Sequence, residues 1–97
     1  MFEIKFTDQA IADLKLLKKA ERRSILSKLE TNLIDEPTAE TRNRKKLRPN
    51  QLAEWELRLG NFRIFYDVDQ DKGLIKIHTV GYKVGSRLII HAKEYKL

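Results

Sequence analysis

The stretch WELRLGNFRIFY, residues 55–66, decides the fold, because it has the pattern of two β-strands joined by the two-residue turn Gly60-Asn61. Side chains alternate between the two faces of a strand. One face therefore collects the apolar residues Trp55, Leu57, Leu59, Phe62, Ile64 and Tyr66. The other face collects Glu56, Arg58, Arg63 and Phe65. The stretch predicts a β-hairpin with one core-building face and one face that carries a carboxylate and two guanidinium groups.

Upstream of this hairpin, residues 2–6 alternate apolar and charged side chains and predict a short first strand. Thr7 or Asp8 is suited to cap a helix. Apolar residues then recur at helical spacing in two groups, Ala10, Ile11, Leu14 and Leu17, followed by Ile25, Leu29 and Leu33. Pro37 ends the second helix. We expect an antiparallel pair of helices that covers the apolar face of the sheet.

Downstream, the second hairpin strand runs to about Asp69, and a turn over residues 69–73 leads into a strand over residues 74–80. Ile75 and Ile77 fall on one face of that strand, and Lys76 and His78 join the polar face. Gly81 and Gly85 bracket Lys83. The tail, residues 86–97, fits either a last strand or a short helix.

These elements predict an α+β fold with an N-terminal strand, a two-helix antiparallel hairpin and an antiparallel β-meander. The helices cover one face of the sheet, and the other face remains open to a partner. Ninety-seven residues make a single domain, residues 1–97.

The composition limits the classes of function. The chain has 20 Lys and Arg against 14 Asp and Glu, a net charge of +6, which favours an anionic partner. It has no cysteine and only two distant histidines, so we expect no disulfide, no metal site and no cofactor. No run is apolar enough to span a bilayer, and no signal-peptide pattern is present. A cytoplasmic protein that does not bind a membrane is expected.

The segment from Thr38 to Arg48 lacks apolar periodicity and is rich in basic residues. Its ordinary interpretation is a solvated loop. Its functional interpretation is a patch that follows the phosphates of RNA beside the sheet. The candidate RNA-binding residues are Arg42, Arg44, Lys45, Lys46 and Arg48, together with Lys76.

The chain resembles the RelE/ParE toxin superfamily of bacterial toxin–antitoxin systems over nearly its whole length. The resemblance is carried by Lys46-Leu47-Arg48, by Arg63 within Phe-Arg-Ile-Phe-Tyr, and by residues 77–81. It implies one of two activities. RelE-like members are ribosome-dependent endoribonucleases that cleave mRNA, and ParE-like members poison DNA gyrase. It also implies a partner, a cognate antitoxin with a disordered and often acidic segment.

The resemblance implies site residues as well. Glu56 and Arg58 fall where some members carry a general base and a transition-state stabiliser, and Arg63 falls on the family's recurrent strand arginine. Lys83 falls near a C-terminal basic position. For the C-terminal proton donor the chain offers His91 or Tyr95, and neither aligns cleanly.

Cleavage of RNA by its 2′-hydroxyl needs a proton acceptor, a group that stabilises the charged phosphorane, and a proton donor for the leaving 5′-oxygen. Glu56 is the candidate acceptor, and two arginines could clamp the phosphate oxygens. His78 and His91 are candidate donors, since imidazole exchanges protons near neutral pH. Each residue also has a structural interpretation, either as a cross-strand ion pair or as packing. Phe65 could stack on a base, or lie beneath the tail or the antitoxin.

We therefore expect the toxin of a type II toxin–antitoxin system that binds mRNA on the ribosome, cleaves it without a metal and inhibits translation. The first alternative is a ParE-like inhibitor of DNA gyrase. The second is a degenerate family member without catalysis that acts as a binding protein.

Overall fold

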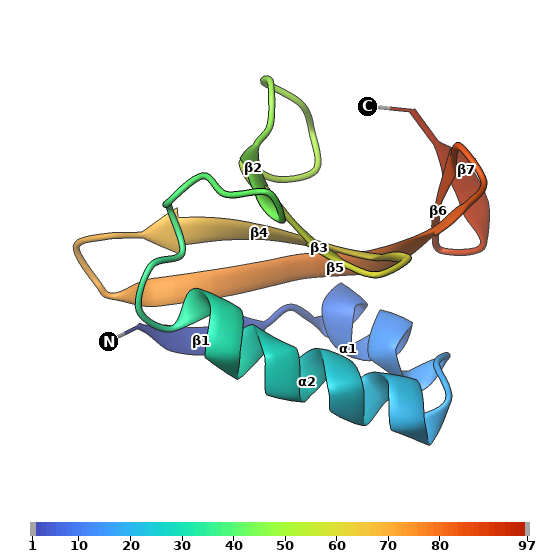
Figure 1. The fold of residues 1–97 in the computed structure, drawn as a ribbon, viewed down its shortest axis with the longest axis horizontal. Helices are drawn as coiled ribbons and strands as arrows, with labels where there is room; N and C mark the ends of the chain where they lie inside the picture. The colour runs from blue at the N-terminus through green and yellow to red at the C-terminus, as the bar shows by residue number, and fades with distance from the viewer. Residues whose placement is uncertain (1, 97) are drawn as a thin grey trace.

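A computed structural model describes residues 2–96 of the chain. Its elements are β1 (Glu3–Phe6), α1 (Asp8–Lys15), α2 (Lys19–Leu33), β2 (Arg44–Lys46), β3 (Trp55–Leu59), β4 (Phe62–Asp69), β5 (Leu74–Val84), β6 (Arg87–Ile90) and β7 (Lys93–Tyr95). The strands form one sheet in the order β2-β3-β4-β5-β6-β7, and β1 lies parallel to β5. Figure 1 shows both helices beneath the sheet, with the β2–β3 loop and the β6–β7 hairpin rising on the other side. The predicted α+β fold, with its helices on one face, is confirmed.

The helices begin where the sequence supplies caps. The Thr7 hydroxyl accepts a hydrogen bond from the backbone N–H of Ala10 at 3.1 Å and donates to the His78 carbonyl at 2.8 Å. This single side chain therefore starts α1 and ties it to β5. The Glu21 carboxylate accepts from the backbone N–H of Lys18 at 3.1 Å and starts α2. No helix within residues 2–96 is long and apolar enough to cross a membrane.

The main core lies between the helices and the sheet. It consists of buried apolar side chains from both helices and from β3, β4 and β5: Ala10, Leu14, Ile25, Leu29, Leu33, Trp55, Leu57, Ile64, Tyr66, Ile75, Ile77 and Val80. The alternation predicted for the hairpin is confirmed, because Trp55, Leu57, Ile64 and Tyr66 all belong to this core. The Gly60-Asn61 turn joins β3 to β4, and Gly60 adopts the left-handed φ of 59°.

Two segments differ from the sequence-based expectation. Arg44–Lys46, predicted within a loop, forms strand β2 because it pairs with Leu57, Glu56 and Trp55 of β3. β5 runs through Gly81 and Lys83 to Val84 instead of ending at Val80. The tail, left open between strand and helix, forms the two strands β6 and β7.

A β-bulge in β5 reverses the pattern of faces along that strand. Phe65 of β4 lies opposite Thr79, whereas Tyr66 lies opposite Ile77, so His78 is the extra residue. Before the bulge the odd-numbered Ile75 and Ile77 face the helices, and after it the even-numbered Val80 does. The bulge therefore turns Lys83 away from the helices.

Candidate functional site

The face of the sheet opposite the helices is partly covered by the β2–β3 loop and the β6–β7 hairpin, which together we call the roof. Phe65, on this face, is fully buried, and it packs in a second apolar cluster with Ala53, Leu88 and Ile90. Leu47, Leu52 and Tyr95 border the cluster. The β2–β3 loop and the β6–β7 hairpin thus cover Phe65, which confirms that its role is packing beneath protein, including the tail.

The side chain of Asn50 holds this roof in shape. Its Oδ1 accepts from the backbone N–H groups of Leu52 and Ala53, at 2.6 and 3.0 Å. Its Nδ2 donates to the carbonyls of Arg48 and Ala53, at 2.7 and 3.0 Å. The loop is therefore ordered by its own hydrogen bonds rather than by regular secondary structure.

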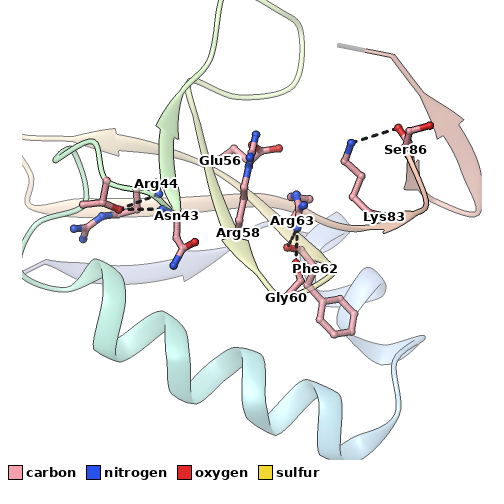
Figure 2. Close-up of polar contacts among 10 residues, drawn as sticks. Asn43, Arg44, Glu56, Arg58, Gly60, Phe62, Arg63, Lys83 and Ser86 are labelled. Carbon is pink, nitrogen blue, oxygen red and sulfur yellow. Dashed lines mark hydrogen bonds and ion pairs between the residues drawn. The ribbon is translucent and has the colours of Figure 1, made fainter.

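Beside the roof lies a polar hollow of about 410 Å³. Its residues come from β3, β5, the β2–β3 loop, the β5–β6 turn, the β6–β7 hairpin and the residue after it: Leu47, Glu56, Arg58, Lys83, Ser86, Arg87, Leu88, Glu94, Tyr95 and Lys96. Figure 2 shows Arg58, Arg63 and Lys83 on three adjacent strands. We call this the cationic hollow, because Arg58 and Lys83 line it. Together with Glu56, they are the members of the predicted catalytic set that it brings together.

The carboxylate of Glu56 orients the guanidinium of Arg58. Arg58 Nε lies 3.0 Å from Glu56 Oε2, and the two side chains are 47% and 6% exposed. Within residues 2–96, neither Glu56 Oε1 nor the terminal nitrogens of Arg58 has a hydrogen-bond partner. A buried carboxylate therefore holds an exposed guanidinium whose free nitrogens can bind an anion.

Arg63 lies directly opposite Arg58 across the β3–β4 ladder. Its Nη1 donates to the carbonyls of Gly60 and Phe62, at 2.7 and 2.9 Å, and its buried Nε has no partner in the described chain. Burial lowers the pKa of Arg63, the negative charge of Glu56 raises it, and the positive charge of Arg58 lowers it again. Arg63 is thus a partly buried cation held by carbonyls at the β3–β4 turn, and it is not among the residues that line the cationic hollow.

Lys83 reaches the cationic hollow because of the bulge in β5. Its Nζ lies 3.4 Å from the carbonyl of Ser86, on the turn that leads into β6 (Figure 2). Tyr95, on β7, is also among the residues that line this hollow. The hollow therefore brings the cations of Arg58 and Lys83 together with the buried carboxylate of Glu56 and with Tyr95, a residue type whose hydroxyl can donate a proton.

The predicted RNA-binding segment divides into residues with different environments. Arg44 donates from Nη1 to the carbonyls of Asn32 and Glu36, at 2.5 and 2.8 Å, so it holds the end of α2. Lys45 lies opposite Glu56 in the backbone register of β2 and β3. Lys46 and Arg48 border a different hollow, and Arg42 is exposed without a hydrogen bond or ion pair to the described residues.

That second hollow, of about 530 Å³, contains His78. His78 Nε2 lies 2.8 Å from Asp67 Oδ2, and Asp67 Oδ1 accepts from the backbone N–H of Glu54 at 2.7 Å. Lys76 is exposed and lies opposite Asp67 in the backbone register of β4 and β5. The β2–β3 loop separates these residues from the cationic hollow, so the structure does not bring His78 or Lys76 to Arg58.

His91 lies elsewhere again, at the turn between β6 and β7. Its Nε2 lies 3.4 Å from Asp13 Oδ1 and 3.1 Å from Thr79 Oγ1. Both partners belong to the edge where α1 meets β5, not to the cationic hollow. Of the two C-terminal proton donors considered, Tyr95 lines that hollow and His91 does not.

The cationic hollow is not the largest hollow in residues 2–96. A groove of about 550 Å³ between the helices and the β3–β4 turn is larger, but Lys83 is the only member of the predicted set at its rim. Within residues 2–96 no three His, Cys, Asp or Glu side chains are placed to hold a metal ion. The sequence placed Glu56 and Arg58 on one strand face, and the structure brings Lys83, named only by the resemblance, to the same hollow. The sequence missed Ser86 and Glu94, which line the hollow from the β5–β6 turn and from β7.

The sequence matches one protein family. Residues 4–83 match the family described as the ParE toxin of type II toxin–antitoxin system, parDE. A comparison with the sequences of curated proteins gives no significant match.

Solved structures of similar fold are toxins with or without their antitoxins. The RelBE2 toxin–antitoxin complex of Mycobacterium tuberculosis contains a chain 24% identical to this one, with a TM-score of 0.73, covering 84% of this chain and 98% of that one. The isolated RelE toxin of E. coli is 22% identical, with a TM-score of 0.71 and coverage of 89% and 88%. The YoeB–YefM complex of Staphylococcus aureus gives 23% identity, a TM-score of 0.64 and coverage of 87% and 99%. These similarities confirm the fold.

Proposed function

The chain belongs to the RelE/ParE superfamily of toxins from type II toxin–antitoxin systems, and on that premise we propose that it is a ribosome-dependent endoribonuclease. The cationic hollow is its site. The observation that carries the proposal is the meeting of Arg58, Lys83 and Tyr95 around one hollow, with a buried carboxylate behind them. Similar folds among RelE and YoeB toxins support it.

In this proposal the phosphate to be cleaved lies against Arg58 and Lys83. Their positive charges stabilise the phosphorane, because fixed donors aimed at developing charge need no reorganisation during the reaction. Arg63 does not line the hollow, but it lies opposite Arg58 in the β3–β4 ladder and adds to the positive potential there. Glu56 holds Arg58 in place through Oε2, and its Oε1 accepts the proton of the attacking 2′-hydroxyl.

Tyr95 is the proposed proton donor to the leaving 5′-oxygen. Its hydroxyl can donate a proton, and it lies in the same hollow as both cations. His78 and His91 remain outside the site, since the first is bound to Asp67 and the second to Asp13. The cleavage needs no metal ion from the protein.

We also propose a cognate antitoxin as the partner. Several similar structures are toxin–antitoxin complexes, including those of Mycobacterium tuberculosis and Pyrococcus horikoshii. The chain has a net charge of +6, and its cations gather beside the roof, so an acidic segment of the antitoxin would be attracted to that face.

The second candidate is inhibition of DNA gyrase, and the match to the ParE toxin family favours it. Such inhibition requires binding to gyrase rather than proton transfer, so it does not need Glu56 and Tyr95 as an acid–base pair.

Inducible expression with separate labelling of new protein, RNA and DNA distinguishes the candidates. We expect protein synthesis to fall first, and Tyr95→Phe, which keeps the ring and loses the proton donor, to relieve the block. A fall in DNA synthesis ahead of protein synthesis would favour gyrase. No effect of the wild type would favour a family member without catalysis.

A further inference from the structure

The edge of β5 has a gap that a side chain of α1 fills. β1 pairs with residues 74–77 of β5, and β6 pairs with residues 82–84, which leaves the edge between them without a strand. Asp13 of α1 occupies this gap, and it is 5% exposed. Its Oδ2 accepts from the Thr79 hydroxyl and, at 3.0 Å, from the backbone N–H of Val80. A buried carboxylate thus replaces the missing strand as the partner of the β5 backbone.

The other oxygen of Asp13 reaches a different part of the fold. Gln9 Nε2 donates to Oδ1 at 3.0 Å, and His91 Nε2 lies 3.4 Å from the same atom. His91 also lies 3.1 Å from Thr79 Oγ1. Among the described residues that contact Asp13 in this way, His91 is the one that belongs to the β6–β7 hairpin. Its imidazole therefore joins the hairpin to α1 and β5.

The backbone at this turn is strained. His91 and Ala92 have φ of 54° and 62°, a left-handed conformation that costs residues other than glycine about 1–2 kcal/mol each. Neither asparagine nor glycine, the usual residues of such a turn, is present. A contact made by His91 is thus expected to offset part of the strain.

The hairpin has few other attachments. Within residues 2–96, β7 pairs with β6 alone, and β6 pairs with β5 through three residue pairs. An isolated two-stranded hairpin is only marginally stable. The remaining contacts are apolar, from Leu88, Ile90 and Tyr95 to the cluster around Phe65. The link between His91 and Asp13 is therefore the polar attachment at the far end of the hairpin.

We propose that His91 and Asp13 are positioning residues that hold the β6–β7 hairpin against the sheet and thereby place Tyr95 in the cationic hollow. His91 fixes the turn of the hairpin, and β7 follows the turn directly, from Lys93 to Tyr95. The anchor itself stands on geometry alone, and its effect on catalysis rests on the proposed function.

Two glycine substitutions in the same turn separate the imidazole contact from the backbone strain. His91→Gly removes the contact and relieves the strain, whereas Ala92→Gly relieves the same kind of strain and leaves the contact in place. Hydrogen exchange of the amides in β6 and β7 is measured by NMR, with the amide of Ile64 in the main core as the internal reference. Because both variants relieve strain of the same kind, the difference between them reports the contact, and we expect the hairpin amides to exchange about tenfold faster in His91→Gly than in Ala92→Gly. Exchange in His91→Gly that is equal to or slower than in Ala92→Gly would overturn the anchor.

The same two variants test the effect on the site through the rate of mRNA cleavage on ribosomes. A looser hairpin with a lower cleavage rate in His91→Gly, and a normal rate in Ala92→Gly, is the expected result. A looser hairpin with an unchanged rate would overturn the positioning role. If the wild-type protein did not cleave RNA, the proposed function would fail, and the exchange experiment would still decide whether the anchor exists.

Discussion

The two faces of the sheet are covered by different means, and adjacent residues of β4 show the contrast. Tyr66 faces the helices and Phe65 faces the opposite side, yet both are fully buried. Tyr66 lies under α1 and α2 in the main core, whereas Phe65 lies under a loop and a short hairpin. The second covering stops short of Arg58 and Lys83. The difference indicates that side chains buried on both faces contribute to stability. An anion, by contrast, can reach only the part of the Phe65 face that the loop and the hairpin leave uncovered.

The largest expected effect tests whether the roofed part of the second face is a true core. Phe65→Ala should lower the free energy of unfolding by about 3–5 kcal/mol, because a fully buried aromatic ring leaves a cavity. The same change at half-buried Phe62, on the other face of the strand, should cost less. Urea denaturation measures both. Equal costs would show that the loop and hairpin cover Phe65 only loosely.

Lys83→Ala tests the uncovered part of the same face. We expect RNA cleavage to fall at least about tenfold with little change in stability, because the lysine supplies charge to the site rather than packing. Lys72→Ala, in the exposed turn before β5, makes the same change in net charge away from the site. If the two variants lost activity equally, net charge rather than the cationic hollow would explain the effect.

A smaller effect is expected from the hydroxyl of Tyr66 on the helix face. It donates to the carbonyl of Pro37 at 2.7 Å. Tyr66→Phe should cost about 1–2 kcal/mol of stability, because the buried carbonyl loses its donor. The same substitution at exposed Tyr82 is the control, measured by thermal unfolding. A loss no greater at Tyr66 than at Tyr82 would contradict the assignment of this hydrogen bond.

The same residue predicts a change with pH. Burial raises the pKa of Tyr66, and the nearby charge of Arg44 opposes the shift only partly. The folded protein therefore keeps this proton at a pH where the unfolded chain has lost it. The stability that it contributes should be complete below about pH 10 and fall as the pH rises above that value. Tyr66→Phe should show a smaller alkaline loss than the wild type, as measured by urea denaturation across that range.

The sequence predicted the main core and the β3–β4 hairpin well, because their signals are local. Apolar spacing located both helices, and the Gly60-Asn61 turn set the hairpin. β2 escaped prediction because Arg44–Lys46 has no apolar alternation and becomes a strand only by pairing with β3. The turn at His91 and Ala92 escaped because its residues carry no turn signature.

The site was predictable only in part for a related reason. Glu56 and Arg58 are neighbours on one strand, so alternation alone placed them together. The position of Lys83 depends on the bulge at His78, which reverses the two faces of β5. The pattern of polar and apolar residues along the sequence does not reveal this bulge. The contact of Asp13 with Thr79 spans 66 residues of sequence and follows only from the packing of α1 on β5.

The most direct test of the central claim is the rate at which the purified protein cleaves mRNA on programmed ribosomes. It is measured under single-turnover conditions for the wild type and for Arg58→Ala, after equal unfolding free energies have been established. We expect cleavage by the wild type and a rate lower by about 10²–10³-fold in Arg58→Ala, the loss typical of removing one donor to developing charge. A folded Arg58→Ala protein that cleaves as fast as the wild type would contradict the assignment of the cationic hollow as the site.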